Sequence, residues 1–371
     1  MKFFIANARD WYGKNERPIS SLSLITGFIF EWFTLERVDL FWENLWVAAH
    51  FFIIAGLIVL VNFQETETAA LPASRQAYKD ASRLHFWYLT FLQGFFGGLL
   101  STFLVFYFRS AAFAVSWPFL LLLLAAFVAN ESFKKHYERL IFQLCLFYLS
   151  LLTFVIYIVP VVLRRMGPDV FLISGLISLG AIFLFVGIIG FFAKEKFRKQ
   201  RNMLAVSISG IYLLANILYF LNLIPPIPLS LSDAGIYHSL YKDDAGNYVL
   251  AGESAPDLRN FFAPVENFHW VPGTSVYAYS AIFSPALFNT NVIHEWQKYD
   301  EDSGRWITAT RISLITQGGR DEGWRVYSMK TGISPGSWRV NVETSQGQII
   351  GRLRFNIIQA AEAPSLKTHI K

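Results

Sequence analysis

The sequence predicts a membrane all-α bundle of six to seven transmembrane helices, followed by an all-β, sandwich-like extracytoplasmic domain. Three observations predict this fold class. Apolar residues make up 54% of the 371-residue chain and charged residues only 16%, whereas about a quarter of an average soluble chain is charged. Long apolar runs fill the first 224 residues. From Tyr277 onward, apolar and polar residues alternate, as they do in half-buried strands.

Six apolar runs approach or exceed the roughly twenty residues that cross a hydrocarbon core about 30 Å thick. They are residues 45–63, 86–108, 111–128, 140–163, 170–193 and 203–223. A seventh run, 22–35, is shorter and contains Glu31, so it either spans beside its neighbours or lies at the interface. The amino-terminal segment has no long apolar stretch and is not expected to be a cleavable signal peptide. The prolines at 225, 226 and 228 are expected to end the last run, because proline lacks an amide hydrogen.

Basic residues between the runs predict the orientation, since Lys and Arg near the spans stay on the cytoplasmic side. With seven spans, fifteen of the nineteen basic residues before position 225 fall on one side. The other side receives Arg37, Arg109, Arg164 and Arg165. The amino terminus is therefore expected in the cytoplasm and the carboxy-terminal domain outside it. The five basic residues within 194–201 predict the same side for that domain even if the first run does not span.

The predicted domain boundaries follow from these patterns. Residues 1–20 form a cytoplasmic segment, 21–224 the helical domain, 225–273 a linker and lead-in, 274–358 the β domain and 359–371 a flexible tail.

The β domain is expected to contain at least six short strands. They are predicted at 274–284, 292–298, 305–315, 323–330, 338–344 and 349–357. In the fifth strand, Trp338 is expected on the face opposite Arg339. In the sixth, Ile349 is expected opposite Arg352 and Arg354. Many short strands without helices favour a β-sandwich.

Polar residues within the apolar runs are the candidates for a transport path, because burying such groups in a membrane is costly. They are Glu31, His50, Gln93, Gln143 and Asn216. Their spacing forms no acid pair or basic relay, so hydrogen bonds between helices are the alternative interpretation. Gly94 and Gly98 form a G-x-x-x-G pattern, which predicts close packing of two helices.

No motif predicts an enzyme. The run from Gly332 to Gly336 matches the G-x-S-x-G nucleophile elbow, but Pro335 has no amide hydrogen to donate to an oxyanion. Phosphate-binding glycine motifs are absent from the sequence, so no nucleotide cofactor is expected. Cys145 is the single cysteine, which excludes a cysteine-based metal cage, and no metal site is predicted. The carboxy-terminal half is not basic, which argues against nucleic acid as a partner.

An aromatic and basic constellation in the β domain is the candidate binding site. Its members are His294, Trp296, Arg320, Trp324, Arg325, Tyr327, Lys330, Trp338 and Arg339. Tryptophan and tyrosine supply contact area, and arginine recognises carboxylate or phosphate with two hydrogen bonds. In the alternative interpretation, Trp324 and Trp338 fill the sandwich core and the arginines form a solvated face.

Part of this constellation resembles a known family. The segments 318–320, 324–330, 335–340 and 351–355, with His294 to Trp296 upstream, are similar to the carboxy-terminal domain of a bacterial family called domain of unknown function 2914. The resemblance implies a bacterial inner-membrane protein. It implies no activity and no catalytic residue.

Two functional hypotheses follow. In the first, the protein is not an enzyme, and its extracytoplasmic β domain binds or scaffolds an envelope partner: a protein, peptide or glycan. In the second, the helical half is a small-molecule or lipid transporter or a membrane-embedded enzyme. The lipid bilayer is a partner in both hypotheses, and no oligomeric state follows from the sequence.

Overall fold

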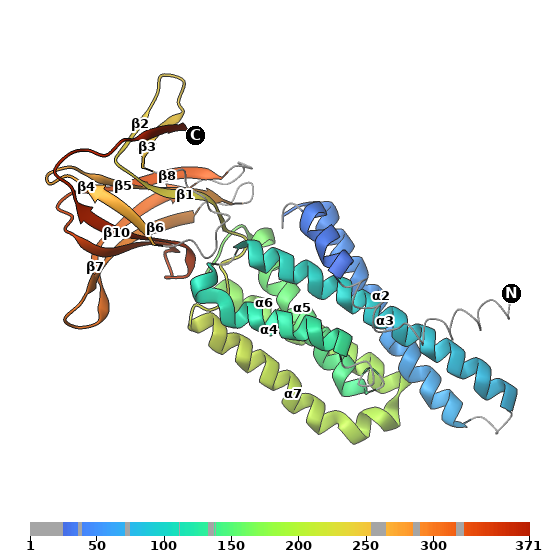
Figure 1. The fold of residues 1–371 in the computed structure, drawn as a ribbon. Helices are drawn as coiled ribbons and strands as arrows, with labels where there is room; N and C mark the ends of the chain where they lie inside the picture. Colours follow the sequence, from blue (N-terminus) through green and yellow to red (C-terminus); the bar gives the residue numbers. More distant parts are fainter. Residues whose placement is uncertain are drawn as a thin grey trace. The chain divides into compact units, whose positions relative to one another are not determined.

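The protein consists of two compact units, one mainly helical and one mainly β (Figure 1). The structure is a computed structural model. It describes residues 25–35, 39–70, 75–110, 112–132, 137, 139–253, 265–284, 290–316 and 323–371. The helical unit is drawn from residues up to Leu218, and the β unit contains everything from Tyr219 to Lys371. The predicted order, with apolar helices first and a β-rich domain second, is confirmed.

The helical unit is built from long helices, preceded by a short helix over residues 25–34. The long helices are α2 Phe41–Ala70, α3 Arg75–Ser110, α4 Phe113–Ser132, α5 Leu140–Leu163, α6 Pro168–Phe192 and α7 Lys194–Phe220. Phenylalanines join several of them. The ring of Phe51 in α2 lies 6.4 Å from Phe103 in α3 and 5.7 Å from Phe147 in α5, and Phe147 lies 4.7 Å from Phe185 in α6.

Five of the described helices are long and apolar enough to span a membrane, fewer than the six to seven predicted. They cover Phe41–Glu65, Leu84–Ser110, Leu140–Leu163, Pro168–Phe192 and Lys194–Phe220. The expected span at 111–128 falls on α4, whose apolar part is Val115–Asn130 within the described residues. The described part of the helix before α2, residues 25–34, has ten residues, which at 1.5 Å each cover about half of the hydrocarbon core.

Several helices continue beyond their apolar runs into segments expected as loops. The basic cluster at 194–201 forms the first two turns of α7, since lysine, arginine, glutamate and glutamine are good helix formers. Likewise α3 begins at Arg75, well before its apolar run. At the other end, α7 stops at Phe220, and Asn222 takes a left-handed φ of 57° that ends the helix just before the prolines.

The β unit contains eleven strands among the described residues. They are β1 Ser230–Tyr237, β2 Ser239–Lys242, β3 Tyr248–Gly252, β4 Glu266–Trp270, β5 Val276–Phe283, β6 Thr290–Asp300, β7 Arg305–Thr316, β8 Trp324–Lys330, β9 Gly336–Thr344, β10 Ile349–Gln359 and β11 Lys367–Ile370. They form a five-stranded sheet, β4-β10-β9-β6-β7, and two three-stranded sheets, β1-β5-β8 and β11-β3-β2. All neighbours are antiparallel except β4 and β10, which are parallel.

The main core lies between the five-stranded sheet and the β1-β5-β8 sheet. Buried Val276 and Ala278 on β5 share one cluster with Trp296 on β6, Trp338 on β9 and Phe355 on β10. The strands alternate, so each presents one apolar face to this core.

Three sequence expectations differ from this arrangement. The predicted lead-in, 225–273, contains strands β1 to β4, because β1 pairs along its length with β5 and β4 with β10. The tail expected to be flexible, 359–371, contains β11, which pairs with β3. In β10, an irregularity between Ile349 and Gly351 changes the predicted faces at the start of the strand, so that Ile350 is buried in the core, while Phe355 faces the core as predicted.

Gly351 in β10 packs against Leu231 in β1, and its substitution is a test of the packing. A Cβ atom there would lie 2.2 Å from Cδ2 of Leu231 in β1. We expect Gly351→Ala to destabilise the β unit by about 1–3 kcal/mol, as overpacked cores do. Thermal unfolding of the purified full chain, followed by near-UV circular dichroism, measures this loss. Combining the change with Leu231→Ala should recover part of it; strictly additive losses would contradict the contact.

Candidate functional site

His294 and Trp296 lie in the core of the β unit and not on its surface. Both side chains are fully buried on the inner face of β6. The His294 ring nitrogens lie 2.8 Å from the hydroxyls of Ser280 and Ser328, and Trp296 Nε1 donates to Ser328 Oγ at 3.0 Å. Burial lowers the pKa of His294 to about 3, so the ring is neutral. These residues fix the packing of β6 against β5 and β8.

The four candidates on β8 have separate surroundings. Trp324 is half-buried against the core, and Tyr327 is exposed beside Tyr248, at 6.0 Å between ring centroids. Arg325 accepts a hydrogen bond from the Tyr248 hydroxyl at its carbonyl, and Lys330 donates to Thr310 Oγ1 at 2.8 Å.

The last three candidates are Trp338, Arg339 and Arg320. Trp338 is buried in the core, with its Nε1 donating to the Ser334 carbonyl at 2.8 Å, and Arg339 lies on the outer face of β9. Arg320 lies outside the described residues. The structure therefore distributes the described members of the constellation between the core, β8 and the outer face of the five-stranded sheet.

The G-x-S-x-G run forms the turn before β9, beside a cleft of about 560 Å³. The Ser334 hydroxyl accepts a hydrogen bond from Lys298 Nζ at 2.8 Å. Lys298, Tyr299, Pro335 and the acidic turn Asp300 to Asp302 are among the cleft residues. Among the described residues, no histidine bonds to Ser334. The run connects strand β8 to strand β9.

A second group of residues forms a regular polar surface, of which the sequence had singled out only Arg339 as a candidate. Strand register sets residues of four strands side by side on the outer face of the five-stranded sheet. One row, from β7 to β10, is Arg311, Glu295, Asn341 and Arg352, and the next row is Thr308, Gln297, Arg339 and Arg354. We call the four arginines, Arg311, Arg339, Arg352 and Arg354, the arginine face.

Neutral amides hold two of these arginines in place. Arg339 Nε donates to Gln297 Oε1 at 2.6 Å, and Arg352 Nε donates to Asn341 Oδ1 at 2.7 Å. The Arg339 guanidinium also lies 4.4 Å from the centre of the Trp306 ring. Within the described part of the chain, the Nη atoms of both residues have no recorded hydrogen-bond partner.

The two carboxylates of this surface are bonded to side chains other than Arg339 and Arg352. Glu295 accepts hydrogen bonds from Thr308 at 2.8 Å and from Asn341 at 3.0 Å, and Glu343 pairs with Arg311 at 2.5 Å. Four arginines against two carboxylates leave the surface positive.

Electrostatic effects reflect this crowding. Burial, and then the charges of Arg339 and Arg354, lower the pKa of Arg352 to about 10. Burial, and then the neighbouring Glu295, raise the pKa of Glu343 to about 7 despite the opposing charge of Arg311. An added anion would reduce the repulsion among the arginines.

Two histidines that are distant in the sequence meet at one carboxylate. Glu253 Oε1 lies 2.9 Å from His238 Nε2, and Glu253 Oε2 lies 2.6 Å from His269 Nδ1. Burial acts to raise the pKa of Glu253, but the hydrogen bonds from His269 and His238 outweigh it and the pKa is lowered. Across the described ranges, no group of three or more His, Cys, Asp or Glu side chains is arranged to hold a metal ion.

Of the polar candidates in the helical unit, Glu31 and His50 lie near each other, and the others have separate partners. Thr102 donates to Glu31 Oε1 at 3.3 Å, and His50 lies near the same turn of α3. Gln93 and Asn130 exchange side-chain to carbonyl hydrogen bonds, and Gln143 accepts from Asn62 at 2.7 Å. Asn216 bonds only to Tyr212 on its own helix among the recorded hydrogen bonds.

The fold is that of a two-part protein with apolar helices before a β-rich domain. Residues 289–357, which span β6 to β10 within the described ranges, match the model of a family described as "Protein of unknown function (DUF2914)". This match confirms the family resemblance found in the sequence. No curated protein matches the chain significantly.

Three solved structures are similar to parts of the chain at low identity. An immunoglobulin-like protein from Pseudomonas aeruginosa is 10% identical, with 35% of this chain and 96% of that one covered and a TM-score of 0.20. A β-glucosidase from Listeria innocua in complex with gluconolactone is 13% identical over 30% and 16%, with a TM-score of 0.19. An alkylpurine DNA glycosylase from Pseudomonas fluorescens, bound to DNA containing an abasic-site analogue, is 11% identical over 82% and 97%, with a TM-score of 0.19.

The raised pKa of Glu343 predicts a specific pH dependence of stability. The folded protein binds more protons than the unfolded chain between about pH 4.5 and about 7, so the stability from this group is lost as the pH rises through about 7. Glu343→Gln removes that loss. The melting temperature of the variant, relative to the wild type, should rise between about pH 5 and about pH 8 by a few degrees. His294 titrates in both chains and cancels from the comparison; a constant difference would refute the assignment.

Proposed function

We propose that this protein is a multi-pass protein of the bacterial cytoplasmic membrane whose β domain, outside the cytoplasm, binds an anionic envelope partner through the arginine face. One observation carries the binding proposal: two arginines anchored through Nε by neutral amides, with their Nη atoms left for a ligand. A carboxylate or phosphate can accept two hydrogen bonds from such a fork.

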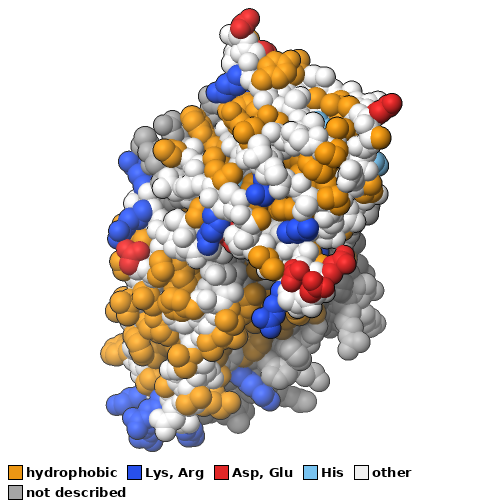
Figure 2. Space-filling model, turned by 90° about the vertical axis from the view of Figure 1, so that its left-hand side faces the viewer, with side chains coloured by type: hydrophobic (Ala, Val, Ile, Leu, Met, Phe, Trp, Pro, Cys, Tyr) orange, Lys and Arg blue, Asp and Glu red, His pale blue; other side chains and the backbone are white. Residues whose placement is uncertain are grey.

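The surface of the helical unit supports insertion into lipid. Large apolar side chains are exposed on several helices, among them Phe52, Phe183, Leu184, Phe191 and Val206. In Figure 2, hydrophobic side chains gather over the helical unit, and lysine and arginine side chains gather at its lower end. Exposed apolar patches of this extent are unusual in soluble monomers, whereas lipid solvates them.

The charge distribution along the helices supports the orientation. Five basic residues lie within 194–201, in the first two turns of α7, while the β domain follows the far end of the same helix. If α7 spans the membrane with its basic end in the cytoplasm, the β domain lies on the other side.

Labelling of introduced cysteines tests the orientation. The background variant is Cys145→Ser, because Cys145 is the single cysteine. Ser303→Cys, in the exposed turn between β6 and β7, should react with a membrane-impermeant maleimide in intact spheroplasts. Lys199→Cys, exposed on α7, should react only after lysis. The reverse pattern would place the β domain in the cytoplasm.

Anion binding is tested with the full chain in detergent and two fluorescent probes, polyglutamate and polyphosphate. Fluorescence anisotropy should detect binding that weakens with salt, because exposed charges are screened. The double change Arg339→Gln and Arg352→Gln should weaken it by about a hundredfold or more, since charge-assisted hydrogen bonds contribute about 1.5–3 kcal/mol each and the double change removes at least two. Which probe binds distinguishes carboxylate from phosphate as the preferred group.

Arg305→Gln is the matched control, because Arg305 is exposed at the start of β7 and outside the arginine face. It should bind like the wild type. If the double variant and the wild type unfold alike on heating and bind the probe equally, the arginine face is not the binding site.

A further inference from the structure

Gly98 in α3 is the point where two ionisable side chains of the helical unit meet. A Cβ atom there would lie 3.6 Å from His50 Nε2 and 3.9 Å from Glu31 Oε1. Gly94, the other half of the G-x-x-x-G pattern, would meet nothing within 4 Å. The expectation that this pattern packs two helix backbones together is therefore wrong at Gly94. At Gly98, the missing side chain leaves room for polar groups from α2 and the helix of residues 25–34.

The hydrogen bonds of these two side chains leave two acceptors at the same place. His50 Nδ1 lies 2.9 Å from the Trp46 carbonyl, which can only accept, so Nδ1 carries the hydrogen and Nε2 of a neutral ring is an acceptor. Glu31 Oε1 accepts from Thr102, and Oε2 has no hydrogen-bond partner among the described residues. Both acceptors border the space beside Gly98, and each can bind a proton.

The other groups recorded around this point carry no charge. They include the hydroxyls of Ser101 and Thr102 and the rings of Trp46 and Phe95, whose centroids lie 4.8 and 5.4 Å from that of His50. Glu31 and His50 are thus the titratable pair at this position within the described part of the chain. Such groups at membrane depth are costly and usually functional.

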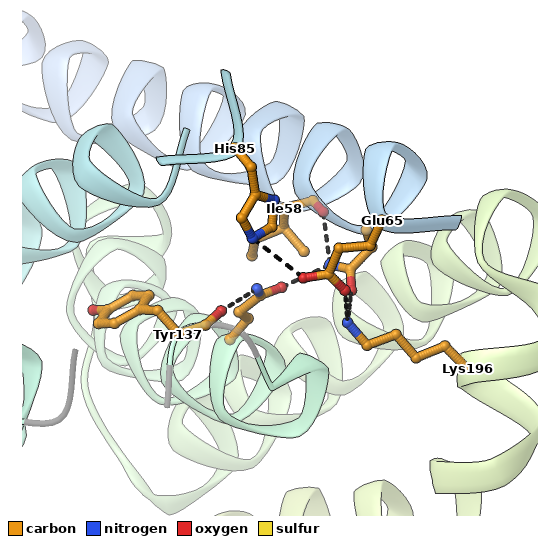
Figure 3. A network of polar contacts seen from close by, with 7 residues as sticks. Ile58, Glu65, His85, Tyr137 and Lys196 are labelled. Carbon is orange, nitrogen blue, oxygen red and sulfur yellow. Dashed lines mark hydrogen bonds and ion pairs between the residues drawn. The ribbon is translucent and has the colours of Figure 1, made fainter. Parts of the chain in front are cut away.

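A second charged cluster lies toward the opposite end of α3 (Figure 3). Lys196 in α7 pairs with Glu65 in α2 at 2.5 Å, and His85 in α3 lies 3.4 Å from the same carboxylate. Lys196 also donates to Asn62 Oδ1 at 2.8 Å, and Asn62 donates to Gln143. Because Lys196 belongs to the basic start of α7, this cluster lies at the end proposed to face the cytoplasm.

Polar side chains connect this cluster toward Gly98. Gln143 donates to the Tyr137 carbonyl, and the Tyr137 hydroxyl donates to Asn130 Oδ1. Asn130 in turn exchanges hydrogen bonds with Gln93, at 3.2 and 3.3 Å. A Cβ at Gly97 would lie 3.2 Å from the Asn130 amide, so adjacent glycines make room for Asn130 on one side and for the Glu31 and His50 pair on the other.

The polar groups lie beside α3 over a length that is close to the thickness of a hydrocarbon core. From His85 to Thr102, the helix rises about 25 Å, against a hydrocarbon core of about 30 Å. Between Gln93 and Gly98 the helix rises about 7.5 Å along its axis, and bridging water can span this distance.

We infer that the helical half carries protons across the membrane along α3, between the Glu31 and His50 pair and the cluster of Glu65, His85 and Lys196. A proton binds at His50 Nε2 or a Glu31 oxygen and moves toward Glu65 and His85 through water that is hydrogen-bonded to the amides and hydroxyls along α3, so only O–H and N–H bonds form and break. The proton gradient or membrane potential drives the movement. The inference relies on the membrane insertion proposed above and is independent of the arginine face.

Proton flux in reconstituted vesicles tests the inference. The full chain is placed in vesicles of phosphatidylethanolamine and phosphatidylglycerol that contain a pH-sensitive dye, and a potassium gradient with valinomycin makes the interior negative. We expect acidification that depends on the protein. Glu31→Gln and His50→Asn should each reduce its rate about tenfold or more, because each removes a proton-binding group.

The matched control is Ser174→Ala, whose buried hydroxyl bonds to Val170 within α6 and lies on no part of this path; its flux should equal that of the wild type. Thr102→Val, a milder change beside Glu31, should reduce the flux less than Glu31→Gln. All variants are compared by size-exclusion profile before reconstitution. Absence of protein-dependent acidification, wild-type flux in Glu31→Gln, or flux that requires sodium would overturn the inference. If the wild type carries protons but binds neither anionic probe, only the proposed role of the arginine face is refuted.

Discussion

The register of β6 between β7 and β9 is the constraint on which the β unit depends. It places His294 and Trp296 inward and Glu295 and Gln297 outward. A slip by one residue would exchange these two sets, because side chains alternate along a strand. A neutral histidine bonded to two serine hydroxyls would then face solvent, and two buried polar side chains would enter an apolar core without partners. The same register therefore determines both the core and the polar outer surface.

In the helical unit, the corresponding constraint is that buried polar groups need partners. Asn62, Gln143 and Asn130 are almost completely buried, and each is bonded to a side chain or carbonyl of another segment. Four helices and the segment at Tyr137 are thereby held at fixed heights along their axes. Phenylalanine packing alone would permit such helices to slide, since it has no directional bonds.

The sequence predicted what depends on local pattern and missed what depends on register between distant strands. Strands β5 to β10 lie close to their predicted positions, because each alternates over its own length. Strands β1 and β4 were missed, since they lie in a segment of weak alternation and are held by pairing with β5 and β10. Arg352 and Arg354 were placed on the polar side of their strand, but their alignment with Asn341 and Arg339 becomes visible only through cross-strand pairing. Glu65 and Lys196 carry no sequence signal either, because each stands at the polar end of an otherwise apolar helix.

The parallel ladder between β4 and β10 also has a consequence for the order of events during synthesis. Glu266 pairs with Phe355, and strands β5 to β9 all lie between these two segments in the chain. Strand β4 thus emerges early and waits for a partner made almost last, and closing so long a loop slows folding. During that interval its unpaired edge can associate with other chains. The β unit is therefore the part of this protein for which timely assistance by a chaperone matters most.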